Sequence, residues 1–85
     1  MGRIATPPMA SLRKDFGNRL LAIRHERKLT QEQFAEHVGI SVDFLSLIER
    51  GINAPSFETI EQMAKSLRVP VKTLFEFPER RASTR

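Results

Sequence analysis

Residues 30–51 read TQEQFAEHVGISVDFLSLIERG, and this short stretch contains two helix starts and a glycine stop between them. Thr30 and Gln33 match a capping box, in which each side chain accepts a hydrogen bond from the backbone NH of the other residue. Gly39 suits the left-handed position that ends a helix, and Ser41 suits the cap of a second helix. The pattern predicts two short helices joined by a tight glycine turn.

The apolar residues of these two helices, predicted over residues 31–38 and 42–50, recur with the spacing of one helix face. Gly51 is expected to end the second helix. The small residue Ala35, the turn glycine Gly39 and the apolar residues before and after the turn all fall in one register. This combination favours a helix-turn-helix over an ordinary helical hairpin. The residues expected on the buried faces are Phe34, Ala35, Val38, Leu45 and Ile48.

A longer helix is predicted before this motif, over residues 12–27 with Ser11 as its cap. Gly17 lies in its middle, where glycine costs about 1 kcal/mol relative to alanine. We therefore expect another helix to approach closely at Gly17. The residues expected on the inward face are Leu12, Phe16, Leu20 and Ile23, which share one side of a helix.

Two further helices are predicted after the motif. Ser56 suits the cap of a helix over residues 57–67, and Pro70 suits the start of a last short helix because its missing NH is not needed there. The chain is thus predicted to be all-α, with five helices in one domain of residues 11–77. The residues expected to face inward are Phe57, Ile60, Ala64 and Leu67, then Val71, Leu74 and Phe75.

The two ends of the chain are expected to be disordered. Residues 1–10 carry no helical period and contain Pro7-Pro8, which oppose a helix. Residues 78–85 have nothing to bury. Arg3, in the N-terminal arm, either contacts a minor groove or belongs to a mobile tail.

The composition limits the possible partners and compartments. A formal charge of +4 and a pI of about 10.4 in 85 residues suit a polyanionic partner. The chain has no Cys, which excludes disulfides and thiolate catalysis and fits a reducing cytoplasm. Its apolar runs are shorter than the roughly 18 residues of a membrane span. We therefore expect a cytoplasmic protein without a membrane partner.

Residues 30–51 resemble the lambda-repressor-like (Cro-type, xenobiotic-response-element) helix-turn-helix family of bacterial and phage regulators. The similarity extends over about residues 12–76, with FGNRLLAIR before the motif, IERGINAPS closing it and LRVPVKTLF after it. The resemblance implies a five-helix domain that binds double-stranded DNA sequence-specifically as a transcriptional regulator, expected to repress. Lys28 stands where the family often has Gly; if the turn is retained, Lys28 takes a strained positive φ.

In the resembled family, the cap and first turns of the second motif helix contact bases in the major groove. Here none of the matching residues is Gln, Asn or Arg, so bidentate contacts to adenine or guanine are missing. Val42 and Leu47 suit thymine methyl groups; alternatively, Leu47 packs against Phe44 or a neighbouring helix. Asp43 either accepts a hydrogen bond from cytosine N4 or only offsets the helix dipole. The implied base-reading residues are Ser41, Val42, Asp43, Ser46 and Leu47.

The resemblance also implies phosphate ligands and an ion pair. Gln31 begins the first motif helix, where the positive dipole end attracts an anion, and Arg50 and Asn53 flank the end of the second, unless they only cap it. Arg24 and Glu49 are expected to form a partly buried ion pair; the alternative is two unrelated surface charges. Most other basic residues are expected to be solvated, with one or two reaching phosphate.

The remaining expectations concern activity and partners. His25 and His37 lie on different predicted helices without an acid–nucleophile set, so neither an enzyme nor a cofactor or zinc site is indicated. An antitoxin or controller-type protein, whose motif also or mainly serves contact with a toxin or another protein, remains an alternative. A homodimer is expected because full-site affinity usually needs two copies of so small a DNA-binding domain. The contact is expected near residues 68–77, where the apolar surface exceeds what one short helix needs, at Val71, Leu74, Phe75 and Phe77.

Overall fold

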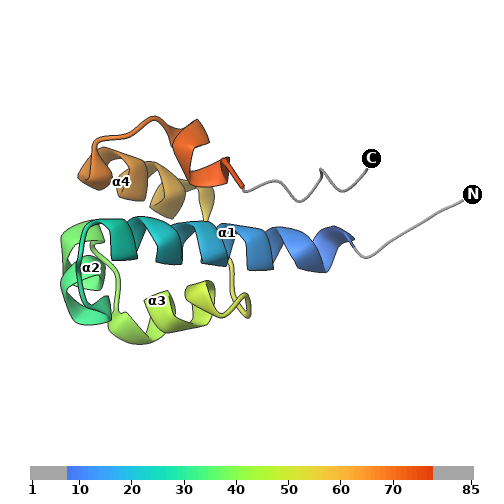
Figure 1. Cartoon of the computed structure of the whole chain (residues 1–85), viewed down its shortest axis with the longest axis horizontal. Coiled ribbons are helices and arrows are strands. Elements are labelled where there is room, and N and C mark those ends of the chain that lie inside the picture. The colour runs from blue at the N-terminus through green and yellow to red at the C-terminus, as the bar shows by residue number, and fades with distance from the viewer. Residues whose placement is uncertain (1–7, 78–85) are drawn as a thin grey trace, which may run out of the picture.

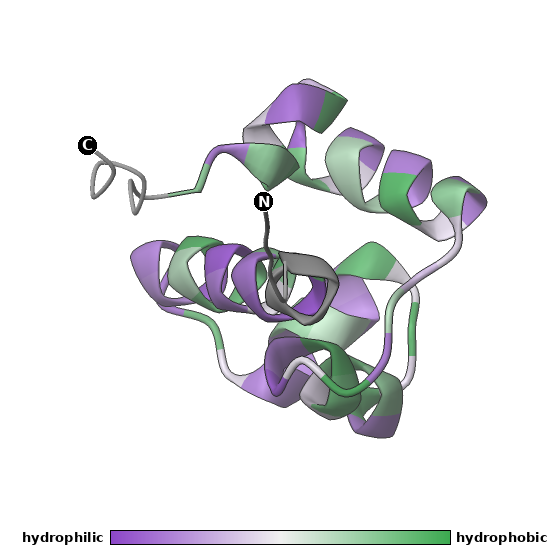
Figure 2. Cartoon of the chain, turned by 90° about the vertical axis from the view of Figure 1, so that its right-hand side faces the viewer, coloured by the Kyte–Doolittle hydropathy of each residue, from purple (hydrophilic) through white to green (hydrophobic). Residues whose placement is uncertain are grey.

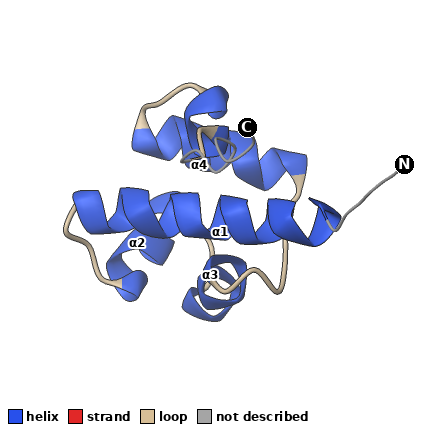
Figure 3. Ribbon diagram, turned by 45° about the vertical axis from the view of Figure 1, so that its right-hand side comes forward, coloured by secondary structure: helices blue, strands red, loops and turns tan. Residues whose placement is uncertain are grey.

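The computed structural model describes residues 8–77, and side chains are described from Leu12 onward. Within these residues every element is helical and no strand occurs (Figure 3), which confirms the all-α prediction. The fifth element is a 3-10 helix instead of an α-helix, since only a short segment follows Pro70 and such segments favour the tighter turn. The elements are α1 (Pro8–Glu26), α2 (Gln31–Val38), α3 (Val42–Glu49), α4 (Phe57–Leu67) and η1 (Val71–Phe75).

The first helix starts earlier than predicted. α1 begins at Pro8 and includes Ser11, so the expectations of an arm extending to residue 10 and of a cap at Ser11 are wrong. Proline opposes a helix interior but suits the first helical position, where its fixed φ is helical and its missing NH has no partner to lose. The expected arm over residues 1–7, with Arg3, and the expected tail over residues 78–85 lie outside the described residues.

α1 crosses the middle of the molecule, with α2 and α3 on one side and α4 and η1 on the other (Figure 1). α2 contacts both α3 and α4 and so connects the two sides beside α1. Figure 2 looks at the N-terminal end of α1, which lies between the two groups of helices. The largest fully buried side chains are Phe34, Leu20, Leu45, Ile48, Met63, Leu67, Leu74 and Val38.

The helix-turn-helix forms as its cap residues predict. Both hydrogen bonds of the Thr30–Gln33 capping box are present. Gly39 ends α2 with φ 83°, and the Ser41 hydroxyl accepts a hydrogen bond from the Phe44 NH at 3.0 Å at the start of α3. These contacts fix the angle between the two helices through local geometry that the sequence already contains.

Gly17 is the position where α1 and α3 touch backbone to backbone. A Cβ placed on Gly17 would collide with the carbonyl oxygen of Ile48 and press on the backbone of Glu49. The expectation of a close helix contact at Gly17 is therefore confirmed. Any larger side chain there would push the end of α3 away from α1.

Within residues 8–77, two residues other than glycine take the left-handed conformation. Lys28, after α1, has φ 58° as predicted, and Arg68, the C-cap of α4, has φ 60°. This conformation costs an L-residue about 1–2 kcal/mol. The strain at Arg68 was not predicted, because nothing in its sequence context distinguishes it from an ordinary helix-ending basic residue.

Some expected core residues lie at the surface. Phe57 is 83% exposed because it is the first residue of α4 and precedes the part of the helix that reaches the core. Leu12 is 49% exposed and Val71 42% exposed, so their expected inward positions are also wrong. Met63, which the sequence analysis did not assign, is fully buried in α4 instead.

Candidate nucleic-acid interface

One side of α3 is fixed against the rest of the molecule and the other faces outward. Leu45 and Ile48 have no exposed surface, and they hold α3 onto the core. All five expected base-reading residues lie at the cap and on the first two turns of this one helix. Ser41 and Asp43 are exposed, whereas the other three, Val42, Ser46 and Leu47, are half-buried.

The side chains on this surface are short, aliphatic or acidic. Val42 packs partly against the core, which leaves only part of it for a ligand. The Ser41 hydroxyl oxygen accepts the bond from Phe44, while its own hydrogen is still available to donate. The surface can thus offer hydroxyl and carboxylate groups and methyl groups to base edges, which matches the functional groups exposed in a major groove.

A buried carboxylate joins α3 to α1 and α2. Glu49 accepts two hydrogen bonds from Arg24, Nε to Oε2 at 2.7 Å and Nη2 to Oε1 at 3.1 Å. The two side chains are only 4% and 11% exposed, so they form the expected ion pair in its buried form. Arg24 also donates to the carbonyl of Leu29 at 3.0 Å, which ties the same cation to the loop before α2.

Gln31 forms a contact with this pair that the sequence analysis did not anticipate. Its Nε2 donates to Glu49 Oε1 at 2.9 Å. An amide nitrogen carries two hydrogens, so one remains for a further acceptor. Gln31 is the first residue of α2, where the free NH groups and the dipole favour an anion.

A second set of polar side chains, Arg50 and Asn53, lies at and just after the C-terminal end of α3. Gly51, with φ 78°, turns the chain there, and the NH groups of Ile52 and Asn53 both donate to the Leu47 carbonyl, at 2.9 and 3.3 Å. Because backbone groups close this helix end, the exposed side chains of Arg50 and Asn53 are not required to cap it.

Two cations of α1 lie at the same turn. Arg13 Nη1 donates to the Ile52 carbonyl at 3.3 Å, and Lys14 lies so close to Gly51 that a Cβ there would contact it. Both belong to the basic residues that were expected to be mostly solvated, with one or two reaching phosphate. Only the crossing of α1 over the end of α3 places them beside the turn at Gly51 and Ile52, and residue spacing along α1 contains no sign of that crossing.

The residues expected at a dimer contact divide into two groups. Leu74 is fully buried in the chain's own core, so it has no surface for a second copy. Val71 and Phe75 are 42% and 38% exposed, and Phe77 is half-buried. The Phe75 ring lies between those of Phe16 and Phe77, with centroids 5.2 and 6.2 Å away.

No group of three or more His, Cys, Asp or Glu in residues 8–77 could hold a metal ion. His37 Nε2 lies 2.8 Å from the Ser66 carbonyl and so links α2 to the end of α4. Among the described helices, none has both the length and the apolar character needed to cross a bilayer.

The fold agrees with comparisons to known proteins. Residues 20–74 match the model of a helix-turn-helix family, and the chain belongs to this family. The immunity repressor protein of Bacillus phage phi105 is 45% identical over 58 residues, 68% of this chain and 40% of that protein. The transcriptional repressor RghR of Bacillus subtilis is 40% identical over 62 residues, 72% and 46% of the two chains. The chain thus spans less than half the length of these two relatives.

Solved structures show the same arrangement of helices. The restriction-modification controller protein C.AhdI of Aeromonas hydrophila superposes with a TM-score of 0.74 at 28% identity, over 81% of this chain and all (100%) of that one. The hypothetical transcription factor NHTF of Neisseria gives a TM-score of 0.75 at 25% identity, over 95% and 93% of the two chains. A shorter relative, the uncharacterized regulator YazB of Bacillus subtilis, is 41% identical over 59 residues, which are 69% of this chain and 86% of that protein.

Proposed function

We propose that this chain is a transcriptional repressor that binds double-stranded DNA sequence-specifically by placing α3 in the major groove. The observation that carries this proposal is the position of α3: one side is held by buried residues, and polar side chains flank it, namely Gln31, which is bonded to Glu49, and the exposed Arg50 and Asn53. A groove-binding helix needs this combination, since phosphates on either side of the groove must be contacted while bases are read. Family membership and the repressor names of two relatives support it.

Sequence is read by the first two turns of α3 in this proposal. Val42 and Leu47 contact thymine methyl groups, and Asp43 accepts a hydrogen bond from cytosine N4. Ser41 and Ser46 donate or accept through their hydroxyl groups. With no Gln, Asn or Arg among these residues, the preferred site is expected to depend on thymine and cytosine positions more than on bidentate purine contacts.

Phosphates position the helix. Gln31 uses its remaining amide hydrogen and the first NH groups of α2 for one phosphate. Arg50 and Asn53 contact a second phosphate, at the turn that follows α3. Arg13 and Lys14 extend this second site, since α1 carries them to the same turn.

The remaining parts of the proposal concern the oligomeric state, the cellular location and a second candidate function. We expect a cytoplasmic, non-enzymatic protein without a bound cofactor that acts as a homodimer, with Val71, Phe75 and Phe77 near the contact. The whole-length fold match to C.AhdI favours a controller-type regulator as a second candidate function. An antitoxin would be favoured by an adjacent toxin gene, whereas a helix-turn-helix used only for protein contact would retain the fold but lose salt-sensitive DNA binding.

Selection of bound sites from random double-stranded DNA tests the main proposal. The expected result is a short palindromic consensus whose half-sites contain preferred thymine and cytosine positions. The matched control is a protein with Ser46→Ala and Leu47→Ala, which should retain non-specific binding but lose the base preferences that these two residues supply. Recovery of unenriched sequences by the wild type would contradict specific reading and favour the role in protein contact.

A further inference from the structure

The C-terminal ends of α1 and α4 lie next to each other at one end of the molecule (Figure 1). Arg27 Nη2 donates a hydrogen bond to the carbonyl of Leu67 at 2.8 Å. This carbonyl belongs to the last turn of α4, where carbonyl groups have no partner within the helix. The bond therefore brings together the residues that follow these two helix ends, Lys28 in the turn after α1 and Arg68 at the C-cap of α4.

Both of these residues are strained. Lys28 and Arg68 are the two residues other than glycine that have a left-handed backbone within residues 8–77. Glycine takes this conformation without a Cβ penalty, so a cation at either position makes the fold less stable than glycine would. A cation near a helix C-terminus gains from the helix dipole, but at an exposed position this gain is smaller than the strain. Strain that persists in a fold commonly marks a function, and the property that both residues share is an exposed positive charge.

The charges at this end of the molecule are not used inside the chain. Lys28, Lys65 and Arg68 are exposed, and none of their side chains forms a hydrogen bond or ion pair with another residue of the described part, 8–77. Residues 65–72, KSLRVPVK, contain three cations and no acid. We call Lys28, Lys65 and Arg68 the cationic end surface. Its three charges are available to an anionic ligand.

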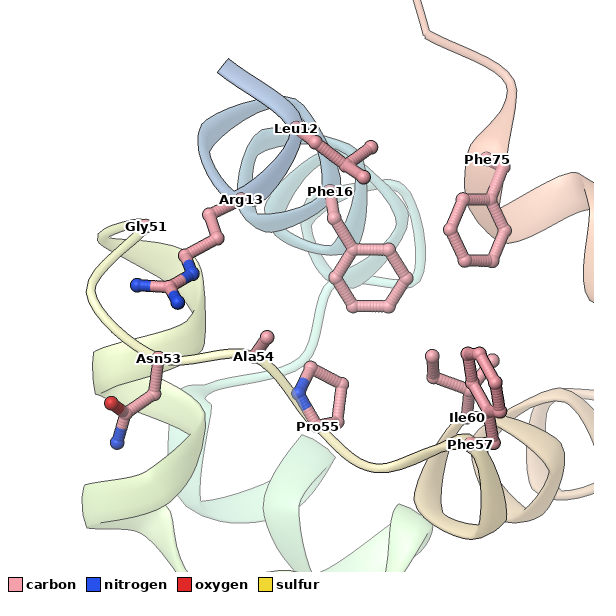
Figure 4. Close-up of a pocket in the computed structure, with 10 residues that line it drawn as sticks. All are labelled: Leu12, Arg13, Phe16, Gly51, Asn53, Ala54, Pro55, Phe57, Ile60 and Phe75. Carbon is pink, nitrogen blue, oxygen red and sulfur yellow. The ribbon is translucent and has the colours of Figure 1, made fainter. Parts of the chain in front are cut away.

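The cationic end surface is separate from the cations at the turn after α3. Arg13 of α1 points toward the turn that carries Asn53 (Figure 4). A helix rises about 1.5 Å per residue, so the last turn of α1 lies roughly 15–20 Å along the helix from Arg13. α3 and α4 also lie on opposite sides of α1 (Figure 1), so Lys65 and Arg68 are on the far side of α1 from a duplex bound along α3.

We propose that the cationic end surface binds a short acidic segment of a partner protein while α3 contacts DNA. Lysine and arginine bind carboxylates through charge-assisted hydrogen bonds, and three unpaired cations suit a short run of Asp or Glu side chains. A second duplex suits this surface less well, because the exposed acids Glu26 and Glu61 lie within about one helical turn of Lys28 and Lys65 and would repel an extended row of phosphates. This choice of a protein over DNA rests on the proposed function, which assigns the duplex to α3.

Fluorescence anisotropy with a labelled oligoglutamate peptide and the full chain tests this surface. Lys28→Gly combined with Arg68→Gly should weaken peptide binding by about fivefold or more, because two charge contacts are lost. The same change should raise the melting temperature by a few degrees, because the backbone strain is relieved. The matched control, Lys14→Ala with Arg50→Ala, removes the same charge beside the turn after α3 and should leave peptide binding unchanged.

Three results would overturn the proposal. The first is a wild type that does not bind the peptide. The second is an equal loss of peptide binding in both double variants, which would show a non-specific attraction of the whole basic chain. The third is a lower melting temperature of the glycine variant, which would mean that the two cations stabilise the fold and have no strain to explain.

DNA binding by the same proteins separates this inference from the proposed function. Lys28→Gly and Arg68→Gly, each alone, should bind the selected duplex as tightly as the wild type, and the wild type should bind peptide and duplex together. Lys28 precedes the expected phosphate ligand Gln31 by only three residues, so the single variants are needed. Weaker duplex binding by either variant, or displacement of the peptide by the duplex, would assign these charges to DNA and overturn the proposal. A wild type that binds the peptide but no duplex would instead overturn the proposed function.

Discussion

Glu49 is an acid in a position where an uncompensated charge would be very costly. With a side chain only 4% exposed, it depends on two hydrogen bonds from Arg24 and one from Gln31. Such a pair contributes little net stability compared with apolar residues of the same size, yet breaking it strands the other charge. Its role is therefore to fix the orientation of α3 and the Gln31 amide in one arrangement.

Replacing Glu49 by alanine should lower stability and DNA affinity together. Loss of the carboxylate leaves Arg24 buried without its counter-charge, at a cost of about 3–5 kcal/mol, and releases the Gln31 amide. At about 4–8 °C per kcal/mol for a domain of this size, thermal denaturation should show a large decrease in melting temperature. Glu61→Ala, which removes an exposed acid of α4, is the control and should change little. Stability equal to the wild type would show that the ion pair is unimportant in solution.

Asp43 is the residue whose role is least constrained by its surroundings. It is exposed in the first turn of α3, where an acid favours the helix dipole by about 0.3–1 kcal/mol. Near DNA the same carboxylate is repelled by phosphates, which a hydrogen bond from cytosine N4 would offset.

Replacing Asp43 by alanine should abolish one base preference in each half-site, worth roughly 1–3 kcal/mol of discrimination. Stability should decrease by less than about 1 kcal/mol, since only the dipole interaction is lost. Site selection from random DNA and a melting curve measure the two effects. If all preferences persist and binding to every sequence tightens, Asp43 only stabilises the helix.

At the scale of elements, the contact between α1 and α3 decides the position of the reading helix. The two backbones meet at Gly17, where an added Cβ would collide with the end of α3. This contact opposes the ordinary preference of helices for alanine over glycine, which is about 1 kcal/mol.

The substitution Gly17→Ala should therefore destabilise the protein, in spite of its better helix propensity. We expect a loss of about 1–3 kcal/mol from overpacking, measured by urea denaturation, and weaker DNA binding because α3 is displaced. Asn18→Ala, at the neighbouring exposed position of α1, is the matched control and should be neutral or slightly stabilising. A stabilised Gly17→Ala protein would mean that α3 moves freely away from α1.

At the scale of the whole molecule, the placement of charge matters more than its total. The chain carries a net charge of +4. Among the described cations, Arg13, Lys14 and Arg50 lie at the C-terminal end of α3 or at the turn that follows it. Arg50 is exposed at the C-terminal end of α3, whereas Lys72 lies on η1, on the opposite side of α1 (Figure 1). Salt-dependent DNA affinity reports cations that neutralise phosphates, so these two residues should behave differently.

Replacing Arg50 by alanine should weaken binding to all DNA sequences alike and reduce the slope of log affinity against log salt by about one unit. The same substitution at Lys72 should leave the slope unchanged. Titrations at several salt concentrations with specific and random DNA measure both. A loss limited to one base position, with an unchanged slope, would assign Arg50 to base reading.

The sequence by itself determined the local structure of this protein. Capping boxes, turn glycines and apolar spacing act within a few residues, so α2, α3 and α4 and their caps at Thr30, Ser41 and Ser56 were predictable. Pro8 was misjudged because proline has opposite effects at the first position and in the interior of a helix. The pairing of Arg24 with Glu49 was anticipated only through the family resemblance.

Only the tertiary structure decided which distant residues meet. The Gln31–Glu49 bond, the cations of α1 beside the turn after α3, and the exposure of Phe57 all depend on how α1 crosses the other helices. Periodicity defines the face of a helix but not where along its length a partner begins or ends, so Leu12 and Phe57 were assigned to the core in error. Crossing geometry is set by packing over the whole chain, and for that reason it is not contained in any single stretch of the sequence.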